Sequence, residues 1–228
     1  MFRPFFTTIV ASILILSCNS SKNEPKKNGS WGKIYQNAYT NHDYQTAIMA
    51  LNHLIITDSA NENHYDSLAT YYLKKTQNYY AGKLMVEKGL AINPNNYQLI
   101  EYKALLMIGE EKFADARTLL EKALTLSKKN KYQYMIATTF ANENNIPEFE
   151  RRIDQLLNGN LPAEKVEAMV DNTTSQMVEL RAICYLGKAK ISRDGASVMK
   201  YVDSALRVQP DYQEAYYILE DLKKKGMK

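Results

Sequence analysis

Residues 97–130 read YQLIEYKALLMIGEEKFADARTLLEKALTLSKKN, and the apolar and small residues of this stretch recur at helical spacing. One helix is predicted at about residues 99–108. A second helix begins near Phe113, after a turn at residues 109–112. Apolar residues three and four positions apart give this second helix one continuous face. They are Ala116, Leu119, Leu120, Ala123 and Leu124. Because small residues let two helix backbones approach closely, the stretch predicts an antiparallel helix pair.

The unit of 34 residues resembles the tetratricopeptide repeat (TPR), a helix–turn–helix with small residues at its 8th, 20th and 27th positions and an aromatic residue near its 17th. In this sequence those positions hold Ala104, Ala116, Ala123 and Phe113. The resemblance implies a right-handed α–α superhelix, or TPR solenoid, in which consecutive helix pairs stack. It also implies a role in binding other proteins.

The same template extends in both directions along the chain. It predicts repeats at residues 31–61, 63–96, 97–130 and 175–212, a degenerate repeat at 131–172 and a capping helix at 213–226. Within this part of the chain, a short extra helix is predicted at residues 162–171 and a longer one at 176–190. No strand pattern is recognised. The predicted fold class is therefore all-α, a solenoid of about five helical hairpins plus a C-terminal capping helix.

The second repeat departs from the template in two ways. A one-residue slip separates it from the first repeat, and Gly82 and Gly89 stand where the template has small alanines. A glycine costs about 1 kcal/mol of helix propensity relative to alanine. We therefore expect close contact between helices at both glycines to compensate for that cost.

The N-terminal segment has the features of an export signal. Arg3 precedes an apolar run at residues 5–16, and Ser17 and Cys18 follow it. The run is shorter than the roughly 20 residues that a transmembrane helix needs. A positive charge, a short apolar region and a small residue before the cut are typical of a secretory signal peptide.

The sequence Ile15-Leu16-Ser17-Cys18 resembles the bacterial lipobox, in which the cysteine is lipidated and becomes the first residue of the mature chain. We predict a lipoprotein signal peptide at 1–17, lipidation with palmitate-type chains at Cys18 and a flexible tether at 18–30. An ordinary signal peptide with a chance cysteine is the alternative. Asn19 replaces the Asp that retains enterobacterial lipoproteins at the inner membrane. The resemblance therefore favours an outer-membrane lipoprotein that faces the periplasm or the cell surface.

Several classes of function are disfavoured by composition and motifs. The net charge of +4 has no long basic block behind it, so no nucleic-acid partner is expected. The three histidines lack metal-ligand spacing and no cysteine pair assists them, so no metal is expected. No phosphate loop, nucleophile elbow or HExxH motif is present. We therefore expect no catalytic residues, cofactor or small-molecule substrate, and we interpret Cys184 as a buried structural thiol.

The TPR resemblance also places candidate binding residues. Positions 2, 5, 9, 12 and 13 of each first helix line the concave face of a TPR stack. The groove residues predicted in this way are Tyr39, His64, Tyr71, Lys74, Lys75, Glu101, Tyr132 and Asn142. Tyrosine offers a large contact area at low entropic cost, and Lys74 with Lys75 could meet a peptide carboxylate. A merely solvated surface is the alternative interpretation.

These features predict a lipid-anchored scaffold or adaptor of the bacterial cell envelope that binds another protein or peptide in its concave groove. The membrane would be reached through the lipid on Cys18. The alternative is a TPR lipoprotein subunit of an outer-membrane assembly machine, for β-barrel assembly or for type IV pilus biogenesis.

Overall fold

The computed structural model describes residues 28–159, 161–170 and 174–224. The predicted signal peptide, the lipidation site Cys18 and most of the tether lie outside the described residues. The first helix, α1, begins at Asn28. The last three residues that were assigned to the tether are therefore helical.

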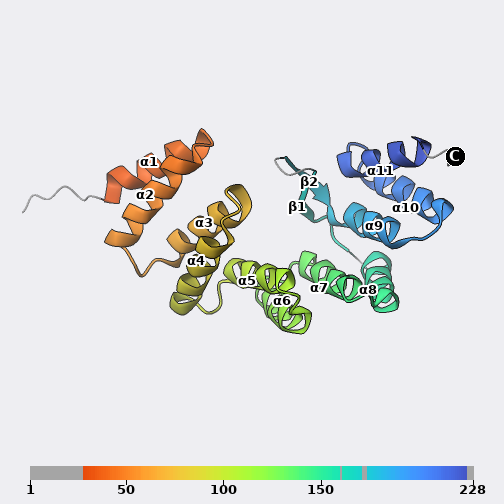
Figure 1. Cartoon of the computed structure of the whole chain (residues 1–228), viewed down its shortest axis with the longest axis horizontal. Helices are drawn as coiled ribbons and strands as arrows, with labels where there is room; N and C mark the ends of the chain where they lie inside the picture. Colours follow the sequence, from red (N-terminus) through yellow and green to blue (C-terminus); the bar gives the residue numbers. More distant parts are fainter. Residues whose placement is uncertain (1–27, 160, 171–173, 225–228) are drawn as a thin grey trace, which may run out of the picture.

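Helices in antiparallel pairs follow one another along an arc that is open on one side (Figure 1). The pairs are α1 (Asn28–Thr40) with α2 (Tyr44–Thr57), α3 (Glu62–Thr70) with α4 (Tyr79–Ile92), α5 (Tyr97–Gly109) with α6 (Phe113–Ser127), α7 (Lys131–Asn142) with α8 (Ile146–Asn158), and α9 (Leu180–Ile191) with α10 (Gly195–Val208). Helix α11 (Gln213–Lys224) follows the last pair. The predicted five hairpins and capping helix are thus confirmed. Among the described helices, none has the length and apolar character needed to cross a bilayer.

The turns inside the first four pairs share one backbone geometry. In each of them, the residue two positions before the second helix has a left-handed conformation, with φ between 52° and 60°. These residues are His42, Gln77, Glu111 and Asn144. The next residue caps the helix in three of the four turns, because the side chains of Asp43, Asn78 and Asn145 accept hydrogen bonds from its first turn. The turns therefore repeat along the chain in the same way as the helices.

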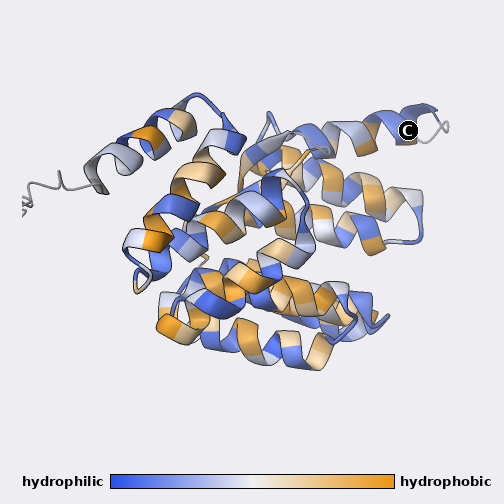
Figure 2. Cartoon of the chain, turned by 60° about the vertical axis from the view of Figure 1, so that its left-hand side comes forward, coloured by the Kyte–Doolittle hydropathy of each residue, from blue (hydrophilic) through white to orange (hydrophobic). Residues whose placement is uncertain are grey.

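Small residues lie at the helix contacts, as the sequence predicts. Ala104, Ala116 and Ala123 have no exposed surface and pack in one cluster between α5, α6 and α7. A Cβ atom at Gly82 would overlap the side chain of Leu73, and one at Gly89 would overlap Leu99. The expected close approach at the two glycines is confirmed. Figure 2 shows hydrophobic residues on the sides of the helices that face one another.

The one-residue slip in the second repeat has a local explanation. Helices α2, α4 and α6 begin at Tyr44, Tyr79 and Phe113, so the first spacing is 35 residues and the second is 34. Between α3 and α4 the chain forms a π-helical turn, η1 (Tyr71–Lys75), in which the amide of Thr76 donates to the carbonyl of Tyr71 at 3.0 Å. A π turn adds one residue to a helix without ending it. We infer that η1 accommodates the extra residue.

A β-hairpin lies between α8 and α9, contrary to the sequence prediction. Strands β1 (Lys165–Met169) and β2 (Ser175–Glu179) pair antiparallel, with Glu167 opposite Met177. The predicted short helix at 162–171 is therefore wrong, and the helix predicted from residue 176 begins only at Leu180.

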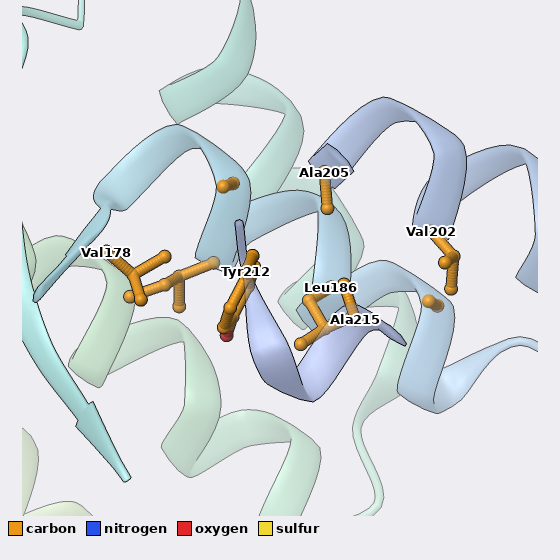
Figure 3. Close-up of a cluster of buried hydrophobic side chains, with 9 residues drawn as sticks. Val178, Leu186, Val202, Ala205, Tyr212 and Ala215 are labelled. Carbon is orange, nitrogen blue, oxygen red and sulfur yellow. The ribbon is translucent and has the colours of Figure 1, made fainter. Parts of the chain in front are cut away.

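The physical reason is an alternation of side chains, which a strand directs to opposite faces. Val166, Ala168 and Val178 pack against the core of the last repeat, while the residues between them are more exposed. Figure 3 shows this core, in which Val178 lies with Leu186 of α9 and with Tyr212 and Ala215 of the capping segment. A hairpin of two strands is only marginally stable alone, so its packing against α9 and the capping segment contributes to its stability.

Candidate protein-binding groove

A groove with a volume of about 1040 Å³ runs along the inner side of the arc. Its helical walls come almost entirely from the first helices of successive pairs, which include Glu101 and Leu105 of α5, Tyr134 and Met135 of α7, and Ile183 of α9. Strand β1 forms a further wall. The groove therefore coincides with the concave face that the TPR resemblance implies.

Only two of the eight predicted groove residues, Lys74 and Glu101, line this groove. Tyr39, His64, Lys75 and Asn142 lie outside its lining. Tyr71 and Tyr132 are buried, at 5% and 0% exposure, so their prediction as surface residues is wrong. Tyr71 packs with Leu51 and Leu68 of the first two pairs, and Tyr132 packs in the cluster between α5, α6 and α7. Both rings fill space between consecutive repeats, which a projection of one repeat alone does not show.

Three lysines of the groove form close ion pairs with carboxylates of the same chain. Lys74 Nζ lies 3.0 Å from Glu167 of β1, so an ion pair crosses the groove between η1 and the hairpin. Lys131 lies 2.6 Å from Glu101, which also accepts a 2.8 Å hydrogen bond from the hydroxyl of Tyr132. Lys190 and Glu214 form a third pair at 2.5 Å. These three lysines are therefore already neutralised within the chain and are not free to bind the carboxylate of a peptide.

Lys75 has a different environment from Lys74, although the sequence analysis predicts both as groove residues. Its ammonium lies 5.8 Å from the centre of the Tyr44 ring, on the side of the first helix pair. The two lysines stand within the π turn, and they face different neighbours. The expected joint capture of a peptide carboxylate by Lys74 and Lys75 is therefore not supported by their arrangement.

One carboxyl group next to the groove is strongly perturbed. Burial, with the charge of Glu101 adding to it, raises the pKa of Asp66 to about 6. Its Oδ1 atom is buried and has no hydrogen-bond partner within the described part of the chain. Burial and Glu101 also raise the pKa of Tyr132. Helix α3 thus holds, close to Glu101 of the groove, a carboxyl group that is costly to ionise.

A second, more apolar cavity of about 690 Å³ adjoins the groove and is lined by η1, the start of α4 and the second half of α5. It shares four lining residues with the groove, namely Leu73, Lys74, Tyr79 and Leu105. Tyr80 also lines it and is 84% exposed, while Leu105 is 43% exposed. Exposed aromatic and aliphatic side chains that border a concave surface are typical of sites that bind other proteins.

The groove residues that the sequence prediction missed belong mainly to the hairpin and to α9. Every residue from position 164 to 170 lines the groove. Their signal was present in the sequence as the alternation Lys165-Val166-Glu167-Ala168-Met169-Val170, which has the period of a strand. In a helix, Val166, Met169 and Val170 would also share one face, which is why a helix is predicted from the sequence at 162–171.

The histidines and Cys184, which are the residues most suited to chemistry, are held in contacts with neighbouring side chains. His53 stacks on Trp31 with ring centres 3.9 Å apart, and His64 lies 3.8 Å from Asp58. Cys184 is buried, as predicted, and burial raises the pKa of its thiol to about 12. A thiol with so high a pKa is a poor nucleophile at neutral pH. Within the described ranges, no group of three or more His, Cys, Asp or Glu is placed to hold a metal ion.

These observations define the class of the protein, a helical-repeat solenoid of paired helices with a groove on its inner side. No protein-family model and no curated protein matches the sequence. Solved structures do match the fold. A tetratricopeptide repeat protein from Parabacteroides merdae superposes with a TM-score of 0.62 at 14% identity, over 88% of this chain and 74% of that one.

Two further solved structures are similar to this chain in fold. PilW, described as a widely conserved type IV pilus biogenesis factor, superposes with a TM-score of 0.60 at 12% identity, over 87% of this chain and 93% of that one. YrrB, described as a TPR protein with an unusual peptide-binding site, has a TM-score of 0.51 at 17% identity, over 83% of this chain and 90% of its own. This chain therefore has the TPR fold, as its sequence predicts.

Proposed function

We propose that this protein is a lipid-anchored scaffold of the bacterial cell envelope that binds a segment of a partner protein in its concave groove. The observation that carries the proposal is the groove of about 1040 Å³, which is continuous from η1 to α9 and bordered by exposed apolar side chains. Its size is at the upper end of the range for ligand pockets, and its open, elongated lining suits a chain segment. The peptide-binding site in the description of YrrB supports the same reading of the fold.

Substitution of Leu105 by Glu should abolish partner binding. Leu105 lines both cavities and is 43% exposed, so a carboxylate at this position would remain hydrated in the free protein but would be buried by a bound partner. The measurement is affinity purification of the full chain from the solubilised envelope of its own cells, followed by mass spectrometry. We expect a defined set of envelope proteins with the wild type and its loss with Leu105→Glu.

The matched control is Leu126→Glu on α6. Leu126 is 41% exposed and lines neither cavity, so the same chemical change is made at nearly the same exposure. This variant should recover the same proteins as the wild type. Recovery of an unchanged set with Leu105→Glu would show that the groove is not the binding site.

The proposed anchor is tested separately at Cys18. Cys18→Ala removes the thiol that lipid would modify, so the variant should appear as a soluble or unprocessed precursor. Cell fractionation with intact-mass analysis measures both outcomes. A mature Cys18→Ala chain that still sediments with membranes would contradict the lipoprotein assignment.

A second candidate is a subunit of an outer-membrane assembly machine. It is favoured by the likeness to PilW, whose description names type IV pilus biogenesis and whose chain is covered almost completely. The purification from envelope distinguishes the two. Pilus or β-barrel assembly components among the recovered proteins would favour this narrower function, and their absence would leave the general scaffold.

A further inference from the structure

The two outer edges of the β-hairpin differ in whether other parts of the chain form hydrogen bonds with them. The amide of Leu180 donates to the carbonyl of Glu164, and that of Val170 donates to Thr174. In an antiparallel pair, residues that bond to the partner strand alternate with residues whose main-chain groups point away from it. The even-numbered residues of β1 therefore bond to β2. The amides and carbonyls of Lys165, Glu167 and Met169 point to the opposite edge.

The outer edge of β2 is covered. The side-chain amide of Gln209 donates to the carbonyl of Met177 at 3.1 Å and accepts from the amide of Glu179 at 2.8 Å. Gln209 thus takes the place of a residue in a third strand. Gln176 extends the cover, because its side chain bonds to the main chain of Asp211 and Gln213.

The outer edge of β1 has no such cover among the described residues, since no hydrogen bond from them reaches the outward main-chain groups of Lys165, Glu167 or Met169. The groove lies along this edge. All residues from 164 to 170 line it, odd and even alike, whereas none of the five residues of β2 does. Figure 1 shows β1 on the side of the hairpin that faces α3 and α5.

We propose that the edge of β1 pairs with an extended segment of the partner protein, which enters the groove as a third strand. This inference rests on the proposed function and names its mode of recognition. An unpaired row of amides and carbonyls is satisfied by another extended backbone. Lys74, Lys131 and Lys190 already pair with carboxylates of this chain. The outward amides and carbonyls of β1 are the main-chain groups of this wall that the described residues leave without a partner.

The walls on either side of β1 give the chemistry of the segment. The groove that β1 borders is also lined by the apolar or aromatic side chains of Leu73, Leu105, Tyr134, Ile183 and Leu186. An extended segment directs alternate side chains to opposite faces. The occupant is therefore a stretch of about five residues, matching the length of β1, that is apolar at alternate positions.

Two substitutions at Glu167 differ in whether the outward main-chain amide is kept. Glu167→Val and Glu167→Pro both remove the carboxylate that pairs with Lys74. Only proline also removes the outward amide, and since that amide is not bonded to β2, the hairpin should persist. Slow hydrogen exchange at Val166 and Ala168, whose amides face β2, verifies that it does.

The probe is a random seven-residue peptide library displayed on phage, selected on the immobilised full chain. We expect the wild type to enrich sequences with alternating apolar residues. Synthetic copies should bind Glu167→Val, whose affinity is the reference for loss of the carboxylate alone. They should bind Glu167→Pro about tenfold more weakly or worse, because a main-chain hydrogen bond is lost and the proline ring obstructs the edge. Methylation of alternate peptide amides along one edge should cause a similar loss.

Each other outcome overturns the inference in a distinguishable way. Peptides that bind both Glu167 variants equally but fail on Leu105→Glu would retain the groove function and exclude edge pairing. If the wild type enriches no sequences beyond those enriched on Leu105→Glu, both the groove function and the pairing at the edge of β1 are contradicted. A wild-type dimer that Glu167→Pro dissociates in sedimentation equilibrium would assign the edge to a second copy of this chain instead.

Discussion

Replacement of Ala123 by Arg should destabilise the protein by about 3 kcal/mol or more. Ala123 has no exposed surface and lies in the cluster of Ile100, Leu120 and Tyr132, where α5, α6 and α7 meet. An arginine at this position must either bury its charge among apolar side chains or separate the helices. Urea unfolding followed by circular dichroism gives the change in the free energy of unfolding.

The control for this prediction is Ala114→Arg on the same helix. Ala114 is exposed, so the same substitution there should change the free energy of unfolding by no more than about 0.5 kcal/mol. An unchanged unfolding midpoint for Ala123→Arg would mean that Ala123 does not occupy the close contact between repeats.

Replacement of Asp66 by Asn should stabilise the protein at pH 7. The pKa of Asp66 is raised from its usual 3.8 to about 6, so the folded state holds this proton over a range in which the unfolded state has released it. Stability is then highest below about pH 4 and falls as the pH rises through 6. Above that range the folded state carries an ionised carboxylate that is poorly solvated and lies near Glu101. We expect Asp66→Asn to raise the free energy of unfolding by about 1–2 kcal/mol. This is less than the full pKa shift would give, because Asp66 is partly exposed and water screens its charge.

The pH dependence of this stability difference tests whether ionisation of Asp66 is its cause. The difference between Asp66→Asn and the wild type should be small at pH 4 and fully developed at pH 7, as measured by thermal or urea unfolding at both values. Asp211→Asn, at an exposed position, should show no such difference. A constant difference across this range would mean that ionisation of Asp66 does not oppose folding.

The sequence by itself determined the helix pairs and their contacts. The small residues Ala104, Ala116 and Ala123 recur at fixed positions because backbones can approach closely only where side chains are small, and this requirement is local and periodic. The same logic identified Gly82 and Gly89, where a Cβ atom would overlap a neighbouring leucine. Contacts of this kind repeat from pair to pair, so one well-formed unit predicts the others.

The tertiary structure decided the composition of the groove. Tyr71 and Tyr132 have the positions of groove residues within their own repeats, yet the neighbouring repeats bury them. Lys74 is paired with Glu167, a residue 93 positions away that the sequence prediction placed in a helix. Residues 162–171 fit a helical face and a strand equally well when read alone. The strand prevails because Val166 and Ala168 pack on α9 and β2 pairs beside them, and these partners are distant in the sequence. Local periodicity determines what a segment can form, whereas the neighbour that buries it determines what it does form.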